Sequence, residues 1–135
     1  TDDSAEGYIT FEFPAVFAGQ FIEGIRLHFS KGEVVEATAD KNQKLLLDLI
    51  GMDAGAKRIG EFGVGTNYSI SRYCYDLLFD EKIGGTVHIA LGRAYPECGG
   101  INKSAFHWDL IKDLREEGAL YLDGKKVLEK GGFLF

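Results

Sequence analysis

Alternation of hydrophobic and polar residues in the first part of the chain predicts three short β-strands. Residues 8–13 (YITFEF) alternate with a period of two and end at Pro14, which has no backbone N–H to donate to a sheet. Residues 20–40 contain two further alternating runs, on either side of a turn at residues 30–33. The side chains that this pattern directs into the core are Ile25, Leu27 and Phe29.

Strand-like segments also dominate the second half of the chain. Residues 85–92 (GTVHIALG) form an apolar run bounded by glycines, which is typical of a buried strand. Residues 104–119 begin as an extended segment and are predicted to turn helical toward Arg115. The Asp123–Gly124 pair, between two alternating runs, predicts a β-hairpin that is followed by a short terminal strand.

Two segments have helical character. Residues 41–52 (KNQKLLLDLIGM) are predicted to form a helix that is capped by Asp40 and ends at Gly51. Residues 71–79 are compatible with a short helix, whereas the glycine-rich residues 61–70 are expected to be irregular. The expected fold is therefore a single compact α+β domain over residues 1–135, with a strand-rich mixed or antiparallel sheet and a few helices.

Charge and composition narrow the function classes. The 135 residues carry a formal net charge of −6 and contain no basic run, so neither a nucleic acid nor an anionic membrane is an expected partner. No apolar run approaches the roughly 20 residues that a membrane-spanning helix needs. The two cysteines, Cys74 and Cys98, form no Cys-x-x-Cys pair, and a reducing cytoplasm is the expected location.

Two histidines and three carboxylates together suggest a metal site. In an extended segment, His107 and Asp109 share one face with their Cβ atoms about 7 Å apart, so both can reach one metal ion or flank two. His88 lies in the middle of an apolar predicted strand, Glu61 lies between glycines, and Glu81 shortly precedes the His88 strand. This mixed nitrogen and oxygen set suits Zn, Mn, Co or Fe, and carboxylates can bridge two cations in hydrolases.

Each of these residues also has a structural interpretation. His88 is equally consistent with a hydrogen-bonded core histidine, and His107 with Asp109 is consistent with a pair that stabilises a turn. Isolated glutamates are usually solvated. Tyr95 is consistent with a packing aromatic whose hydroxyl reaches the rim, and His28 is expected on the solvated face of its strand.

Four motifs, taken in order, give the chain a specific family resemblance. They are GYITFEFPAVFAGQFIEGIRLHFSKGEVVEA, IGEFGVGTN, LLFDEKIGGTVHIALGRAYPECGG and SAFHWDLIKDLR. The chain resembles the C-terminal, catalytic part of the thermophilic-type metalloaminopeptidase family. The resemblance implies hydrolysis of N-terminal residues from peptides by two divalent metal ions (Zn, Co, Mn or Mg), in a cytoplasmic homodimer.

The resemblance also implies roles for individual residues. The positions that match family metal ligands are Glu61, Glu81, His88, His107 and Asp109. Among them, Glu61 matches the bridging carboxylate and has a catalytic role, whereas the spacing from Glu81 to the next histidine varies within the family. Tyr95, seven residues after His88, is similar to the active-site tyrosine of the family.

One family feature does not match this chain. The family has a further metal-binding glutamate in a Gly-Glu segment just before the strand that corresponds to residues 8–13, and neither Asp2 nor Glu6 occupies such a motif. The chain is therefore expected to be a domain of an enzyme whose N-terminal domain and at least one ligand are absent, and to be weak or inactive in isolation. The alternative is a non-catalytic β-rich dimerisation or binding module with structural His and Glu residues, and convergence of the candidate ligands would discriminate between the two.

Overall fold

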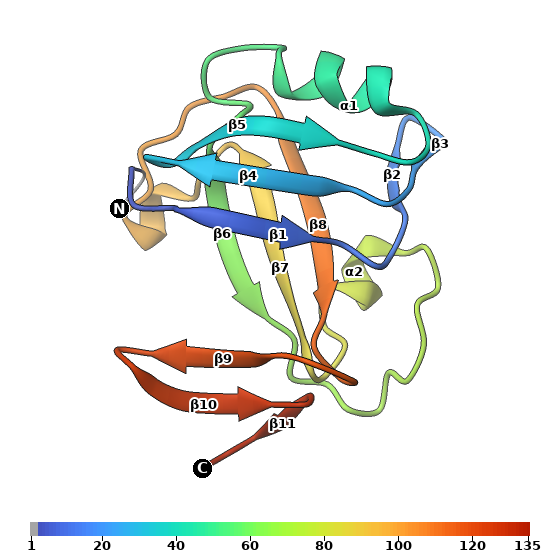
Figure 1. Cartoon of the computed structure of the whole chain (residues 1–135), viewed down its shortest axis with the longest axis vertical. Helices are drawn as coiled ribbons and strands as arrows, with labels where there is room; N and C mark the ends of the chain where they lie inside the picture. Colours follow the sequence, from blue (N-terminus) through green and yellow to red (C-terminus); the bar gives the residue numbers. More distant parts are fainter. Residues whose placement is uncertain (1–2) are drawn as a thin grey trace.

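The computed structural model describes residues 3–135, in which short antiparallel ladders predominate (Figure 1). The first sheet has the strand order β1-β4-β5. Between β1 and β4 in the sequence, β2 and β3 form a separate small hairpin. These strands are β1 (Gly7–Thr10), β2 (Ala15–Phe17), β3 (Gln20–Ile22), β4 (Arg26–Ser30) and β5 (Glu33–Thr38). Asp2, which does not occupy the expected Gly-Glu motif, lies outside the described residues.

The second sheet has the order β6-β7-β8 and carries the candidate ligands. Its strands are β6 (Ile59–Val64), β7 (Thr86–Gly92) and β8 (His107–Asp113). Helix α1 (Gln43–Ile50) precedes this sheet, the short helix α2 (Leu77–Asp80) lies between β6 and β7, and a 3-10 turn, η1 (Pro96–Cys98), lies between β7 and β8.

A third sheet, of order β11-β10-β9, lies at the end of the molecule opposite α1 (Figure 1). Its strands are β9 (Ala119–Leu122), β10 (Lys125–Glu129) and β11 (Gly132–Phe133). The predicted hairpin at Asp123–Gly124 and the predicted terminal strand are thus confirmed. No helix among the described residues has the length and apolar character to cross a membrane.

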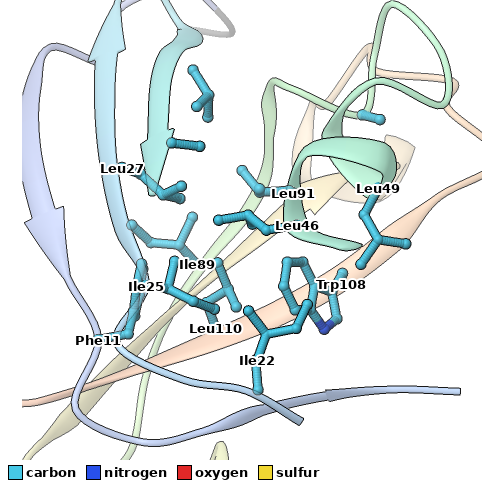
Figure 2. Packing of buried hydrophobic residues seen from close by; sticks show 14 of the residues in the cluster. Phe11, Ile22, Ile25, Leu27, Leu46, Leu49, Ile89, Leu91, Trp108 and Leu110 are labelled. Atoms are coloured by element: carbon cyan, nitrogen blue, oxygen red, sulfur yellow. The ribbon is translucent and has the colours of Figure 1, made fainter. Parts of the chain in front are cut away.

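The main core lies between the first sheet, the second sheet and α1, as Figure 2 shows. It unites side chains that alternate inward from β4, β7 and β8 with two leucines of α1. Its fully or nearly fully buried members include Ile25, Leu27, Leu46, Leu49, Ile89, Leu91, Trp108 and Leu110. Every second residue of β7 and of β8 faces this core. The intervening residues of each strand, which include His88 and Asp109, therefore face away from it.

Several local predictions were wrong in informative ways. Helix α1 begins after Asn42 rather than after Asp40, because the Asp40 carboxylate pairs with Arg26 at 2.6 Å instead of capping the helix. The predicted helix over residues 71–79 is confined to α2, where Asp76 accepts a hydrogen bond from the Leu78 N–H. The expected helical turn after β8 does not form, and residues 115–117 make a bend.

The largest correction concerns residues 61–70, which were expected to be irregular. Their first part belongs to β6, which pairs with β7 over five residue pairs from Ile59 to Val64. The glycines that suggested a loop are needed inside the strand, where neighbouring groups leave no room for a side chain. Glu61 therefore lies on a paired strand rather than on a loop.

Candidate metal centre

The register of the second sheet places four candidate ligands on one face. Glu61 on β6 pairs with Ala90 on β7, and Ala90 pairs with Asp109 on β8. His88 lies two residues before Ala90, and His107 lies two residues before Asp109, so all four side chains point to the same side of the sheet. The small and fully buried Ala90 side chain lies between the two carboxylates.

A β-bulge in β6 turns Glu61 toward this face. Ile59 pairs with Leu91 and Glu61 pairs with Ala90, so Gly60 is the extra residue of the bulge. A Cβ atom on Gly60 would lie 2.2 Å from the Gly92 carbonyl oxygen, so only glycine fits there. In a regular strand Ile59 and Glu61, which are two residues apart, would face the same side; the bulge at Gly60 instead lets Ile59 pack against the core while Glu61 faces the ligands.

The Glu61 carboxylate is oriented toward both histidines. Its Oε1 atom lies 3.3 Å from His88 Nε2, and its Oε2 atom lies 3.7 Å from His107 Nε2. His107 Nε2 also lies 3.5 Å from Asp109 Oδ2. Ligand atoms from Glu61, His88 and Asp109 all lie within 4.8 Å of one another, which is close enough for one cation to reach all three.

A hydrogen bond to the backbone fixes the orientation of the His107 ring. Its Nδ1–H donates a hydrogen bond of 2.8 Å to the backbone carbonyl of Arg93. Because a carbonyl oxygen can only accept, Nδ1 carries a proton, and Nε2 is the ring nitrogen that faces Glu61 and Asp109. Metal-binding histidines are held in this way by a backbone carbonyl or carboxylate partner.

His88 is buried and incompletely satisfied. Its side chain lies directly over Gly63, where a Cβ atom would be 2.1 Å from the imidazole Cε1 atom. In the part of the chain that the structure describes, His88 Nδ1 is buried without a hydrogen-bond partner. An unpaired buried polar atom costs about 1–3 kcal/mol. The other ring nitrogen, Nε2, is the one that faces Glu61.

Asp109 is the most buried of the carboxylates in this group, with 6% of its side chain exposed. Burial raises its pKa, and the nearby negative charge of Glu61 raises it further, whereas His107 partly opposes both effects. One buried and one partly exposed carboxylate beside two imidazoles form a mixed oxygen and nitrogen set that suits a divalent cation such as Zn²⁺ or Co²⁺. The residues present therefore fit a metal ion.

The other predicted site residues lie at the edges of this group. Glu81 forms an ion pair of 2.8 Å with Lys82, and it is near enough to Asp109 to raise the pKa of that carboxyl, but it is not among the converging ligands. Tyr95 packs its ring edge against His107, with ring centroids 5.8 Å apart, and is largely exposed. Glu6 accepts a hydrogen bond from the Lys31 backbone N–H.

The glycines around Glu61 were expected to allow close approach, but sequence reasoning did not identify which groups they approach. A Cβ atom on Gly63 would meet the His88 ring, and one on Gly60 would meet the carbonyl oxygens of Gly92 and Arg93. The available signal was the repeated glycine in GEFGVG, which marks close backbone approach as readily as it marks a loop.

Comparison with known proteins identifies relatives of this chain. The family described as "Thermophilic metalloprotease (M29)" matches residues 1–133. Aminopeptidase PepS of Streptococcus thermophilus is 32% identical over 91% of this chain and 34% of its own length, and aminopeptidase T of Thermus thermophilus is 31% identical over 93% and 35%. The structure of wild-type AmpT from Thermus thermophilus superposes with a TM-score of 0.83, at 30% identity, and the match covers 99% of this chain and 38% of that one. The chain thus spans about a third of the length of these relatives. Because the family match extends over nearly all of its residues, this protein belongs to the thermophilic metalloprotease (M29) family.

Proposed function

We propose that this chain is the C-terminal, metal-binding part of an aminopeptidase that removes N-terminal residues from peptides by means of two divalent metal ions. The observation that carries the proposal is the convergence of Glu61, His88, His107 and Asp109 on one face of the β6-β7-β8 sheet. The names of the relatives, which are aminopeptidases, support the reaction class. The proposed metals are Zn, Co, Mn or Mg.

Glu61 is the proposed bridging and catalytic carboxylate. Its two oxygens face different histidines, which is the orientation that a carboxylate shared between two cations needs. Bound divalent cations would supply an acidified water and a Lewis acid for the scissile carbonyl. A carboxylate, either Glu61 or the further glutamate that the family resemblance implies, would accept a proton from the attacking water and return it to the leaving amine.

His107 and Asp109 would hold their ligand atoms in fixed positions, because both project from one strand of a paired sheet. His88 would complete the set from the neighbouring strand, and Glu81 is a proposed further ligand that would have to leave Lys82. Tyr95 lies beside His107 with its ring exposed, and its hydroxyl is the proposed hydrogen-bond donor to the developing oxyanion.

The substrates proposed are peptides with a free N-terminus, and a cytoplasmic homodimer is proposed for the complete protein. The rival interpretation, a non-catalytic module with structural His and Glu residues, requires each of these side chains to be satisfied within the fold. The close approach of ligand atoms from Glu61, His88 and Asp109 is the observation that argues against that interpretation.

The test uses the complete protein and the His107→Ala variant. Metal content is measured with and without prior chelation, alongside hydrolysis of an aminoacyl anilide. We expect wild-type protein to bind divalent metal and to lose activity on chelation, and we expect His107→Ala to lose activity while its circular dichroism spectrum is unchanged. Wild-type turnover in His107→Ala would contradict the assignment, and a complete protein that binds no metal would support the module interpretation.

A further inference from the structure

A polar network outside the ligand group connects a distant turn of the chain to the strand that carries His107 and Asp109. At its centre is Asp53, which lies in the turn between α1 and β6. Its partners belong to the loop between η1 and β8, which ends at Phe106, directly before His107. The Asp53 and Ser104 side chains are hydrogen-bonded although they are 51 residues apart in the sequence.

The Asp53 carboxylate closes its own turn and holds the loop at the same time. Its Oδ1 atom accepts hydrogen bonds of 2.9 Å from the backbone N–H groups of Gly55 and Ala56. The Ser104 hydroxyl lies 2.8 Å from both carboxylate oxygens, and the Ala105 N–H donates to Oδ2 at 3.2 Å. The hydrogen bond from Ser104 is the largest of the effects that lower the pKa of Asp53, so this side chain is an ionised acceptor at neutral pH.

Hydrogen bonds continue from Ser104 to the imidazole of His107. A hydroxyl has one proton to donate, and that of Ser104 is directed to Asp53, so its oxygen accepts the Phe106 N–H at 3.1 Å. The Phe106 carbonyl accepts the Arg93 N–H at 2.6 Å, and the Arg93 carbonyl accepts the Nδ1–H of His107 at 2.8 Å. Four consecutive hydrogen bonds thus join Asp53 to a candidate metal ligand.

The turn and the loop are packed against each other without space for a side chain on Gly55. A Cβ atom there would lie 2.3 Å from Asn102 Oδ1 and 2.9 Å from the Ser104 Cβ atom. Asn102 adds a second link, because its Nδ2 donates to the Gly55 carbonyl at 2.9 Å while its Oδ1 accepts the Ser104 N–H at 3.0 Å. Ser104 is buried, with 6% of its surface exposed, so water has little access to replace its hydrogen bonds.

We propose that Asp53, acting through Ser104, is a positioning residue for His107. By holding the loop before β8, it fixes the Arg93 carbonyl that orients the imidazole, and with it the Nε2 atom that faces the other ligands. This inference rests on the proposed aminopeptidase function, because it concerns the same metal centre. A purely structural link would stabilise the fold and leave metal affinity unchanged, so the experiment must separate these two effects.

The test uses the complete protein, with Ser104→Ala as the main variant. This substitution removes one hydroxyl, leaves the hydrogen bonds within the Asp53 turn and breaks the path to Phe106. Asp53→Ala breaks the same path at its start, and a double variant combines both changes. Tyr68→Phe is the control, because it removes a hydrogen bond of 2.7 Å from the Tyr68 hydroxyl to the Gly131 carbonyl, which lies outside this network.

Three properties are measured for each protein. Zinc affinity is obtained by competition with a chromophoric chelator, and the visible absorption spectrum of bound Co²⁺ reports the geometry of the ligands. Circular dichroism gives the melting temperature, so that affinity and spectrum are compared at a temperature where every variant is folded. Hydrolysis of an aminoacyl anilide is followed in parallel.

We expect Ser104→Ala and Asp53→Ala each to lower zinc affinity by about tenfold or more, since partners that orient a metal-binding histidine typically contribute about 10–100-fold. Both should also change the Co²⁺ spectrum. The double variant should lose no more affinity than Asp53→Ala alone, because both residues act along one path. Tyr68→Phe should lower the melting temperature and leave affinity and spectrum as in wild type.

Wild-type zinc affinity in Ser104→Ala, an equal loss of affinity in Tyr68→Phe, or losses that multiply in the double variant would each overturn the positioning role alone. If Asp53→Ala does not fold, the comparison of Ser104→Ala with Tyr68→Phe decides. A wild-type protein that binds no divalent metal and hydrolyses no aminoacyl anilide would overturn the aminopeptidase function and this inference with it.

Discussion

Replacing Gly63 with alanine should disable the proposed metal centre without altering any ligand. Gly63 is paired with His88 across the sheet, and a Cβ atom there would lie 2.1 Å from the imidazole Cε1 and 2.2 Å from Nε2. Carbon atoms in contact prefer separations of about 3.5–4.0 Å, so the ring must shift by more than about 1 Å. Gly63 is not among the glycines with positive φ, so alanine is compatible with its backbone and the effect is confined to this contact.

The size of the effect follows from that shift. The displaced ring loses its approach of 3.3 Å to Glu61 Oε1 and can no longer share a cation with Asp109. Changes to groups that orient a metal-binding histidine typically cost about 10–100-fold in metal affinity. A misplacement of about 1 Å at a reacting centre costs about 100-fold in rate. Crowding in a packed site should also lower the free energy of unfolding by about 1–3 kcal/mol.

The assay measures zinc affinity by competition with a chromophoric chelator, together with kcat/KM on an aminoacyl anilide. Gly132→Ala is a matched control, because the nearest atom to its added Cβ lies 3.6 Å away and its φ is not positive. In a His88→Ala background, where the clashing ring is absent, Gly63→Ala should have little further effect. Wild-type zinc affinity in Gly63→Ala, or an equally large loss in the His88→Ala background, would refute the reasoning.

Two further predictions concern stability. Chelation should lower the melting temperature of the complete protein, because a ligand that binds only the folded state at 100 times its Kd contributes about 2.7 kcal/mol; an identical melting curve before and after verified metal removal would count against a folded-state metal site. Asp113→Asn should lower the free energy of unfolding at neutral pH by about 1–3 kcal/mol, because Asp113 accepts two hydrogen bonds, of 2.9 and 2.8 Å, from the Arg115 guanidinium. Burial alone would raise the pKa of Asp113, but the hydrogen bonds from Arg115 outweigh it and lower the pKa, so this stabilisation is present above the ordinary pKa of an aspartate and is lost as the pH falls. Denaturant unfolding at pH 7 and at pH 3 should therefore show a difference between wild type and variant that shrinks in acid, and a constant difference would contradict the prediction.

The strands could be predicted where their residues alternate regularly. The inward-facing residues Ile25, Leu27 and Phe29 are all buried, and His107 and Asp109 share a face of β8 as their spacing predicted. Strand β6 could not be predicted in this way, because the bulge at Gly60 breaks the period of two. A glycine chosen for close approach and a glycine chosen for a turn look the same in the sequence.

Convergence of the ligands was even less accessible to sequence reasoning. Glu61 and His88 are 27 residues apart, and the segment between them contains a helix, α2, and a long irregular stretch. Which residue of β6 faces which residue of β7 depends on the register, and a shift of one residue would point Glu61 into the core. The spacing of His107 and Asp109 predicted that they share a face of one strand. Only the pairing of β6, β7 and β8 shows that Glu61 and His88 lie on the same face.

The energetics of this face explain why a metal ion is the natural occupant. Asp109 is nearly buried beside Glu61, His88 has a buried nitrogen without a partner among the described residues, and the sheet keeps all three groups together. Two adjacent carboxylates repel each other, and a desolvated carboxylate is unfavourable unless a cation compensates its charge. The imidazoles compensate only in part, since burial and Glu61 still raise the pKa of Asp109. A bound divalent cation would offset the repulsion between the two carboxylates and would also compensate the charge of the desolvated Asp109. The glycines beneath His88 and in the bulge before Glu61 thus maintain an arrangement that costs stability when empty and regains it on binding metal.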